Sequence, residues 1–269
     1  MKLYLNFERA LVPMEVDALR EMIRRRGQRE PLQHIVGSTS FCGLEIAVNR
    51  HALAPRPETE LLAELGWQFL STLNLQPSTA LDFGTGSGCI AIALAVKCPS
   101  AKIVATDVSP DALALAKQNA GRHNAAERIE FLQGNGFELT SEGRVTRVPK
   151  SNTETKIGDL HSSPLLKMEF DLIISNPPYI PSAEVATLQP EVRDFDPRVA
   201  LDGGTDGLDF YRLIAAHAAA FLKSDGKIML EFGDGQAQAV RKIFENEKWI
   251  VEAVKEDYSH RARILIVRQ

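Results

Sequence analysis

Cysteine is scarce in this chain: only Cys42, Cys89 and Cys98 occur among 269 residues. Their number is odd, and their spacing matches neither a disulfide framework nor a zinc site. The six histidines are scattered, without a pair at metal-ligand spacing. We therefore predict buried thiols in a reducing, cytoplasmic compartment rather than disulfides, and no metal site.

Long apolar segments and a strong charge of one sign are also missing. The apolar run over residues 89–96 is far too short to cross a bilayer, and the N-terminus carries Glu8 where a signal peptide would have an apolar core. The formal net charge is −4, which gives no support to a surface built for long tracts of phosphate backbone. These absences predict a protein that binds no membrane and does not bind nucleic acid directly.

What the sequence does contain is a β-branched apolar run that stops at two consecutive prolines, over residues 170–179. This pattern predicts a buried strand followed by a rigid loop. Because each proline fixes φ and lacks an N–H group, the backbone beside Asn176 mainly offers acceptors. The Asn176 side-chain oxygen and the Pro177 carbonyl could accept the two N–H groups of a substrate amide, and Tyr179, after Pro178, could stack on its flat face. Taken alone, the same residues could simply end a strand.

Residues 79–95 predict a strand, a glycine-rich loop and a helix in succession. Glycine at alternate positions lets the backbone turn tightly and lie against a ligand. The pattern is typical of a nucleotide-type cofactor site, with the cofactor held by Gly84, Thr85, Gly86, Ser87 and Gly88.

Two carboxylates narrow the identity of the cofactor. Asp107 ends the next predicted strand, about 20 residues after the glycines, where a Rossmann-like unit places the group that accepts from both ribose hydroxyls. Asp82 lies just before the glycines, where it would repel a pyrophosphate but attract the amino and sulfonium charges of S-adenosylmethionine. The electrostatics therefore favour S-adenosylmethionine over a nicotinamide cofactor. At the end of the third strand, the candidates for holding the adenine are Asn135, Gly136 and Phe137.

The rest of the chain predicts alternating helices and strands. Apolar spacing predicts helices over residues 13–26, 59–73, 110–123, 208–222 and 236–247, and strands over residues 102–106, 129–132, 227–231, 250–254 and 262–267, of which the last two pair antiparallel. A β-hairpin is predicted within residues 37–48, and residues 139–168, which lack periodicity, predict a flexible insertion.

Arg56 stands between two prolines directly before a predicted helix. The prolines stiffen this approach, and the acidic residues that follow complement the dipole of the helix. The arginine is explained either by the start of the helix alone or by a role in lining a substrate site.

Together these motifs resemble the HemK/PrmC family of release factor glutamine methyltransferases. The resemblance rests on Asp-Phe-Gly-Thr-Gly-Ser-Gly, on Asn-Pro-Pro-Tyr, and on the segments at residues 29–32, 55–60, 191–195 and 197–198. It implies an α/β fold with the Rossmann-like, seven-stranded sheet of class I methyltransferases. It further implies a truncated N-terminal helical segment plus β-hairpin over residues 1–54 and an S-adenosylmethionine-dependent methyltransferase domain over residues 55–269.

The resemblance also implies an activity. It is methylation of the side-chain amide nitrogen of the glutamine in the Gly-Gly-Gln motif of peptide chain release factors, with no metal. Asn176, Pro177 and Tyr179 would be catalytic, and Asn176 would also contact the cofactor. The substrate glutamine would be held by Asn176, Pro177, Pro178, Tyr179 and Arg56.

Two alternatives stay open at this point. An amino-methyltransferase acting on another protein glutamine or on DNA adenine could share Asn-Pro-Pro-Tyr, although a DNA enzyme should show a target-recognition region and a basic face. A cofactor-binding protein without catalysis is the second alternative, because the family usually has several N-terminal helices where this sequence predicts one. Asn135 stands where the family commonly has an acidic residue, which predicts weaker cofactor binding.

Overall fold

The computed structural model describes residues 8–73, 77–135, 137–139 and 168–269. The insertion predicted over residues 139–168 therefore lies almost entirely outside the described residues. Among the residues that are described, no helix is long and apolar enough to cross a membrane.

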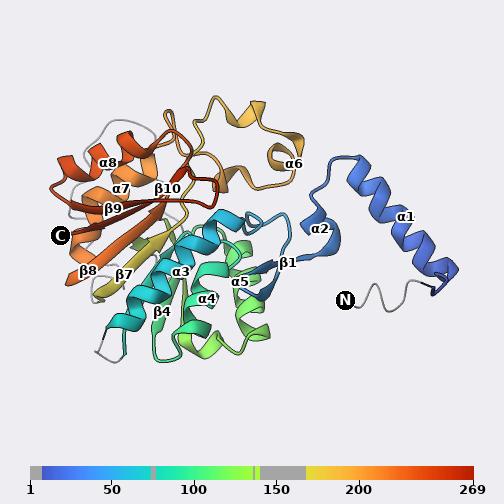
Figure 1. Cartoon of the computed structure of the whole chain (residues 1–269), viewed down its shortest axis with the longest axis horizontal. Helices are drawn as coiled ribbons and strands as arrows, with labels where there is room; N and C mark the ends of the chain where they lie inside the picture. Colours follow the sequence, from blue (N-terminus) through green and yellow to red (C-terminus); the bar gives the residue numbers. More distant parts are fainter. Residues whose placement is uncertain (1–7, 74–76, 136, 140–167) are drawn as a thin grey trace.

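One large sheet forms the centre of the protein (Figure 1), with its strands in the order β6-β5-β4-β3-β7-β8-β10-β9. The strands β5, β4, β3, β7 and β8 run parallel, and β10 pairs antiparallel with both β8 and β9. Seven of these strands form the predicted class I methyltransferase sheet, and β6 adds two residues at the edge, antiparallel to β5. The strand bounds are β3 Thr79–Phe83, β4 Lys102–Asp107, β5 Ile129–Asn135, β6 Glu138–Leu139, β7 Phe170–Ser175, β8 Leu222–Glu231, β9 Ile250–Glu256 and β10 Ala262–Arg268.

Helices cover both faces of the sheet, because successive side chains of the buried strands point to opposite faces. Ala80 of β3 packs in the core that contains residues of α3 (Pro57–Thr72) and α4 (Cys89–Lys97), whereas Leu81 packs with residues of α7 (Asp209–His217) and α8 (Ala237–Asn246). The helix α5 (Pro110–Arg122) begins at Ser109, whose side chain accepts a hydrogen bond from the Ala112 N–H, as an N-cap does.

The largest difference from the predicted boundaries lies between α7 and β8. The predicted helix over residues 208–222 ends at His217 and continues as a 3₁₀ turn, η7 (Ala218–Phe221). The strand β8 then begins at Leu222 instead of residue 227, and Leu222 pairs with Phe170. The sequence did not predict this part of the strand, because residues 223–226 are polar and turn-like and lack the apolar pattern of a buried strand.

The N-terminal elements lie to one side of the sheet (Figure 1). They are α1 (Pro13–Gly27), α2 (Leu32–Val36) and the predicted hairpin, formed by β1 (Ser38–Phe41) and β2 (Leu44–Ala47). The buried Asn119 side chain of α5 attaches the hairpin to the rest of the fold, because it bonds both the N–H and the carbonyl of Ala47, at 2.9 and 3.0 Å. In contrast, α1 has no buried residue and reaches α6 (Pro190–Arg193) through Arg26, which pairs with Glu191 at 3.1 Å.

Leu94→Ala on α4 tests this division between core and periphery. Leu94 is completely buried, so the cavity left by its side chain should lower the free energy of unfolding by about 2 to 5 kcal/mol. Leu19→Ala on α1 is the matched control: its side chain is exposed, and the change should stay within about 0.5 kcal/mol. Urea unfolding measures both, and equal losses would contradict the placement of the core.

Candidate active site

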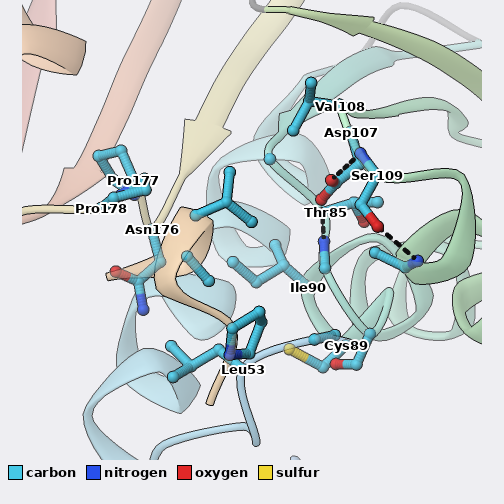
Figure 2. A pocket seen from close by; sticks show the side chains of 18 of the residues that line it. Leu53, Thr85, Cys89, Ile90, Asp107, Val108, Ser109, Asn176, Pro177 and Pro178 are labelled. Carbon is cyan, nitrogen blue, oxygen red and sulfur yellow. Dashed lines mark hydrogen bonds between the residues drawn. The ribbon is translucent and has the colours of Figure 1, made fainter. Parts of the chain in front are cut away.

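A cavity of about 220 Å³ lies where the parallel strands β3, β4 and β7 end. Carboxyl ends of neighbouring parallel strands meet at one edge of a sheet, which is where α/β proteins bind ligands. Figure 2 shows the glycine loop and Asp107 on one side of this cavity and Asn176, Pro177 and Pro178 on the other. The structure thus brings together two motifs that the sequence placed far apart.

The glycine loop turns through backbone conformations that favour glycine. Gly84 has φ +72° and Gly88 has φ +82°, both in the left-handed region. Residues 84–87 line the cavity. Gly88 instead serves the packing of α4 on α5, because a Cβ atom at this position would lie 3.0 Å from the Ala116 Cβ. Four of the five loop residues predicted to hold a cofactor therefore lie at the cavity.

Asp107 ends β4 at the cavity wall, as the sequence predicted for a ribose-binding carboxylate. Its Oδ2 accepts a hydrogen bond from the Gly86 N–H at 2.8 Å, and its Oδ1 accepts from the Ser109 N–H at 2.9 Å. Burial raises the pKa of this carboxyl group, and the two backbone hydrogen bonds oppose the shift. Because each carboxylate oxygen can accept more than one hydrogen bond, Asp107 keeps the capacity to accept from two hydroxyl groups.

Asp82 lies behind the cavity wall. Its side chain is fully buried and does not line the cavity, and its attraction for a sulfonium group stays a prediction. Instead, Oδ2 accepts hydrogen bonds from Thr85 Oγ1 at 2.6 Å and from the Ala91 N–H at 3.0 Å, which braces the glycine loop against the start of α4. Burial raises the pKa of Asp82 to about 7.

The residues predicted to hold an adenine are also placed differently. Phe137 is 2% exposed and does not line the cavity. Its ring stacks on that of Phe221, with 4.8 Å between the ring centroids, and lies tilted against that of Phe83, with 5.2 Å between the centroids. A large aromatic ring gains more from this buried contact than from an open cavity wall. Asn135 ends β5 but its side chain, like the whole of Gly136, lies outside the described residues. Of the described residues in this segment, Gly134 lines the cavity.

The side-chain amide of Asn176 has a fixed orientation at the cavity wall. Its Nδ2 donates a hydrogen bond to Thr59 Oγ1 at 3.0 Å, and Thr59 Oγ1 in turn donates to Glu231 Oε2 at 2.7 Å. Asn176 Oδ1 has no hydrogen-bond partner in the part of the chain that the structure describes. The same is true of the Pro177 carbonyl. Two acceptors with unused capacity therefore stand together at residues 176–177.

Close contacts hold the backbone that follows. A Cβ atom at Gly203 would lie 2.7 Å from the Pro178 carbonyl oxygen, and one at Gly207 would lie even closer to the carbonyl of Tyr179. The Tyr179 carbonyl also accepts a hydrogen bond from Gln236 Nε2 at 2.8 Å. Only residues without a side chain allow this approach, so the glycines keep the loop in register.

Tyr179 itself differs from its predicted role. Its ring does not line the cavity but packs against the core that contains Tyr211, and burial raises the pKa of its hydroxyl group to about 12. The absence of a side chain at Gly233 leaves room for the ring, since a Cβ atom there would lie 2.9 Å from Tyr179 Cδ2. Stacking of Tyr179 on a substrate amide is therefore not what this arrangement offers.

Arg56 lies at the wall between this cavity and a second pocket of about 170 Å³. Its Nη2 pairs with Oδ2 of the buried Asp196 at 2.7 Å. The second pocket is also lined by Arg26 and Glu191, so it borders the contact between α1 and α6. The structure therefore favours the site-lining interpretation of Arg56 over a helix start alone.

Sequence reasoning missed Thr59 and Glu231, which orient Asn176. Thr59 sits in the first turn of α3, where its hydroxyl group looks like ordinary helix-start chemistry. Glu231 ends β8 and stands 172 positions from Thr59, so no local pattern predicts their contact. The lining formed by residues 51–55 was missed as well, because its small and apolar residues carry no chemical signal.

Two family models match separate parts of the chain. Residues 1–37 match the PrmC N-terminal domain, and residues 66–149 match the methyltransferase small domain. A release factor glutamine methyltransferase of Geobacter sulfurreducens is 45% identical over 90% of this chain and 74% of its own length. One of Chlorobaculum tepidum is 38% identical over 96% of this chain and 81% of its own. This chain belongs to the release factor glutamine methyltransferase family.

Membership of this family makes the protein a class I S-adenosylmethionine-dependent methyltransferase and confirms the resemblance drawn from its motifs. The fold agrees. A methyltransferase of Pyrococcus furiosus, 20% identical, superposes with a TM-score of 0.55 over 90% of this chain and 98% of that one, and at this identity it supports the fold alone.

Gly203→Ala tests whether backbone packing positions the Asn-Pro-Pro segment. The added methyl group would meet backbone atoms of residues 178 and 179 at 2.7 and 2.9 Å, so the segment must shift. A displacement of this kind should lower kcat for methyl transfer by about 10- to 100-fold. Gly121→Ala on α5 is the matched control, because no atom lies within 4 Å of its Cβ, and it should keep full activity. Full activity in Gly203→Ala would show that the packing does not position the segment.

Proposed function

We propose that this protein transfers the methyl group of S-adenosylmethionine to the side-chain amide nitrogen of the glutamine in the Gly-Gly-Gln motif of peptide chain release factors. The observation that carries the proposal is the pair of unused acceptors at Asn176 and Pro177, on the wall opposite the glycine loop. The names of relatives that are 38 and 45% identical supply the release factor as the acceptor.

The residues at the cavity fit S-adenosylmethionine. Asp107 would accept hydrogen bonds from the ribose hydroxyls, and residues 84–87 would lie against the amino acid end of the molecule. The fit rests on the two oxygens of Asp107, each of which keeps capacity for a hydroxyl group beyond its backbone hydrogen bond. When bound, S-adenosylmethionine supplies a methyl group on a positively charged sulfur that leaves readily.

An amide nitrogen is a poor nucleophile because its lone pair is delocalised into the carbonyl. Asn176 Oδ1 and the Pro177 carbonyl would each accept one of its N–H groups, and two such hydrogen bonds leave a single direction for attack. Proline at positions 177 and 178 keeps competing N–H donors out of this corner. Positioning in a desolvated cavity suffices for an in-line transfer, after which the nitrogen releases its proton to water.

The proposal also divides the chain near residue 54, into an N-terminal segment with the hairpin and a methyltransferase domain. This division is supported by the match of residues 1–37 to the PrmC N-terminal domain. It is also supported by the ion pairs that Arg26 of α1 and Arg29, just after this helix, make with Glu191. A release factor substrate would place the protein in the cytoplasm, where translation takes place.

Asn176→Ala and Asp107→Ala separate the two halves of the proposed site. Asn176→Ala removes an acceptor for the substrate amide, so kcat should fall by about 10²- to 10³-fold. The dissociation constant for S-adenosylmethionine should stay unchanged. Asp107→Ala is the matched control, because it should weaken binding of S-adenosylmethionine by about 1 to 3 kcal/mol. Calorimetry measures binding, and transfer of a labelled methyl group to a release factor measures turnover.

Plasmid DNA serves as the second acceptor in the same assay. Label in the release factor and none in DNA is the expected result for the wild-type protein. Label in DNA alone would overturn the proposed substrate, and label in neither would indicate a cofactor-binding protein. Equal loss of cofactor affinity in both variants would contradict the role given to Asn176.

A further inference from the structure

Three side chains from distant parts of the chain form a hydrogen-bonded row at the cavity wall. Thr59 comes from the first turn of α3, Asn176 follows β7, and Glu231 ends β8. Thr59 is 3% exposed and Glu231 2% exposed. The hydrogen bonds run from Asn176 Nδ2 to Thr59 Oγ1 at 3.0 Å and from Thr59 Oγ1 to Glu231 Oε2 at 2.7 Å.

The Thr59 hydroxyl group has one proton, and this determines which atoms donate and which accept in both hydrogen bonds of the row. An ionised carboxylate can only accept hydrogen bonds, so Thr59 must donate its proton to Glu231. The Thr59 oxygen can then only accept from Asn176, which requires the NH₂ group of the amide at this position. The Asn176 oxygen is thereby left as the atom available to a ligand.

We propose that Thr59 and Glu231 are positioning residues that determine which atom of the Asn176 amide is offered to the substrate, and that they do so only while Glu231 is ionised. The inference rests on the proposed function, in which Asn176 Oδ1 accepts an N–H group of the substrate glutamine. It adds one condition to that function: the carboxyl group of Glu231, which does not touch the substrate, must be deprotonated.

Protonation of Glu231 reverses the row. A proton taken from water onto Oε2 is donated to Thr59 Oγ1, and the Thr59 proton then turns toward Asn176. Only the amide oxygen can accept it, so the amide rotates by half a turn and its NH₂ group replaces the oxygen as the atom available to a ligand. Two N–H groups then oppose each other, and the substrate amide loses an acceptor.

The surroundings of Glu231 set the pH at which this happens. Burial raises its pKa to about 7, and the charge of Glu58 on α3 also raises it. The Thr59 hydrogen bond, the charge of Arg263 on β10 and a hydrogen bond with the Asn176 side chain each lower this pKa. Tyr179 and Tyr211 face the same carboxylate, and burial raises the pKa of both hydroxyl groups, so both stay neutral near pH 7. The row therefore has the active direction above neutral pH and loses it as the pH falls.

Thr59→Val keeps the shape of the side chain and removes both hydrogen bonds, which separates positioning from packing. It should lower kcat by about tenfold, while the dissociation constant for S-adenosylmethionine stays within about twofold. Thr59→Ser, which keeps the hydroxyl group, should restore most of the activity. Thr72→Val, on the exposed end of the same helix, is the matched control and should change neither quantity.

The pH profile distinguishes positioning from a structural role. With the wild-type protein, kcat/KM for the release factor should fall by about tenfold per pH unit below the pKa of Glu231. In Thr59→Val this acid limb should be clearly shallower, because the coupling through the Thr59 hydroxyl group is lost and only the direct interaction of Asn176 with Glu231 is left. An acid limb that persists unchanged in Thr59→Val overturns the inference.

A measurement without any substrate keeps the inference separate from the proposed function. Nuclear Overhauser contacts between the Asn176 NH₂ protons and the Thr59 methyl group should be present at pH 8.5 and lost at about pH 5.5, on either side of the Glu231 pKa. Contacts that are absent at the higher pH, or that persist at the lower one, overturn the inference whatever the acceptor of the methyl group. Failure of methyl transfer to a release factor would overturn the proposed function alone.

Discussion

The parallel alignment of β3, β4, β7 and β8 is the constraint on which the site depends. Because their carboxyl ends meet at one edge of the sheet, the glycine loop, Asp107, Asn176 and Glu231 are neighbours although they are far apart in the sequence. Packed cores on both faces of the sheet hold the strand ends in place. The fold therefore fixes the distance between the cofactor site and the site of the methyl acceptor.

At the cavity wall, residues 176–177 offer hydrogen-bond acceptors and few donors, and this property explains how they could orient a substrate amide. The prolines remove backbone donors, and the row from Glu231 through Thr59 turns the NH₂ group of Asn176 away from any ligand. Both arrangements are set before a substrate arrives, so little orientational entropy is lost on binding. The cost is a carboxylate held away from water, which raises the pKa of Glu231 to about 7 and makes the corner sensitive to pH.

The parts of the site that could be predicted from the sequence carry local signals. Asp107 ends a strand with an unambiguous apolar pattern, and Gly84 to Ser87 and Asn176 directly follow such strands, so that topology places them together. Phe137 and Tyr179 turned toward the core, because the residues that decide this, Phe221 and Gly233, are distant in sequence. Asp82 turned away from the cavity because it accepts hydrogen bonds from Thr85 and from the Ala91 N–H, and these contacts depend on how the glycine loop folds. Hydrogen bonds between separate elements, such as that of Thr59 with Glu231, have no sequence pattern at all.

The most direct test of the central claim is a crystal structure of the protein with S-adenosylhomocysteine and a Gly-Gly-Gln peptide. We predict that the glutamine amide nitrogen lies within hydrogen-bonding distance of Asn176 Oδ1 and of the Pro177 carbonyl, with its free side toward the sulfur. A glutamine amide bound by other groups, or an Asn176 oxygen turned toward Thr59, would contradict it.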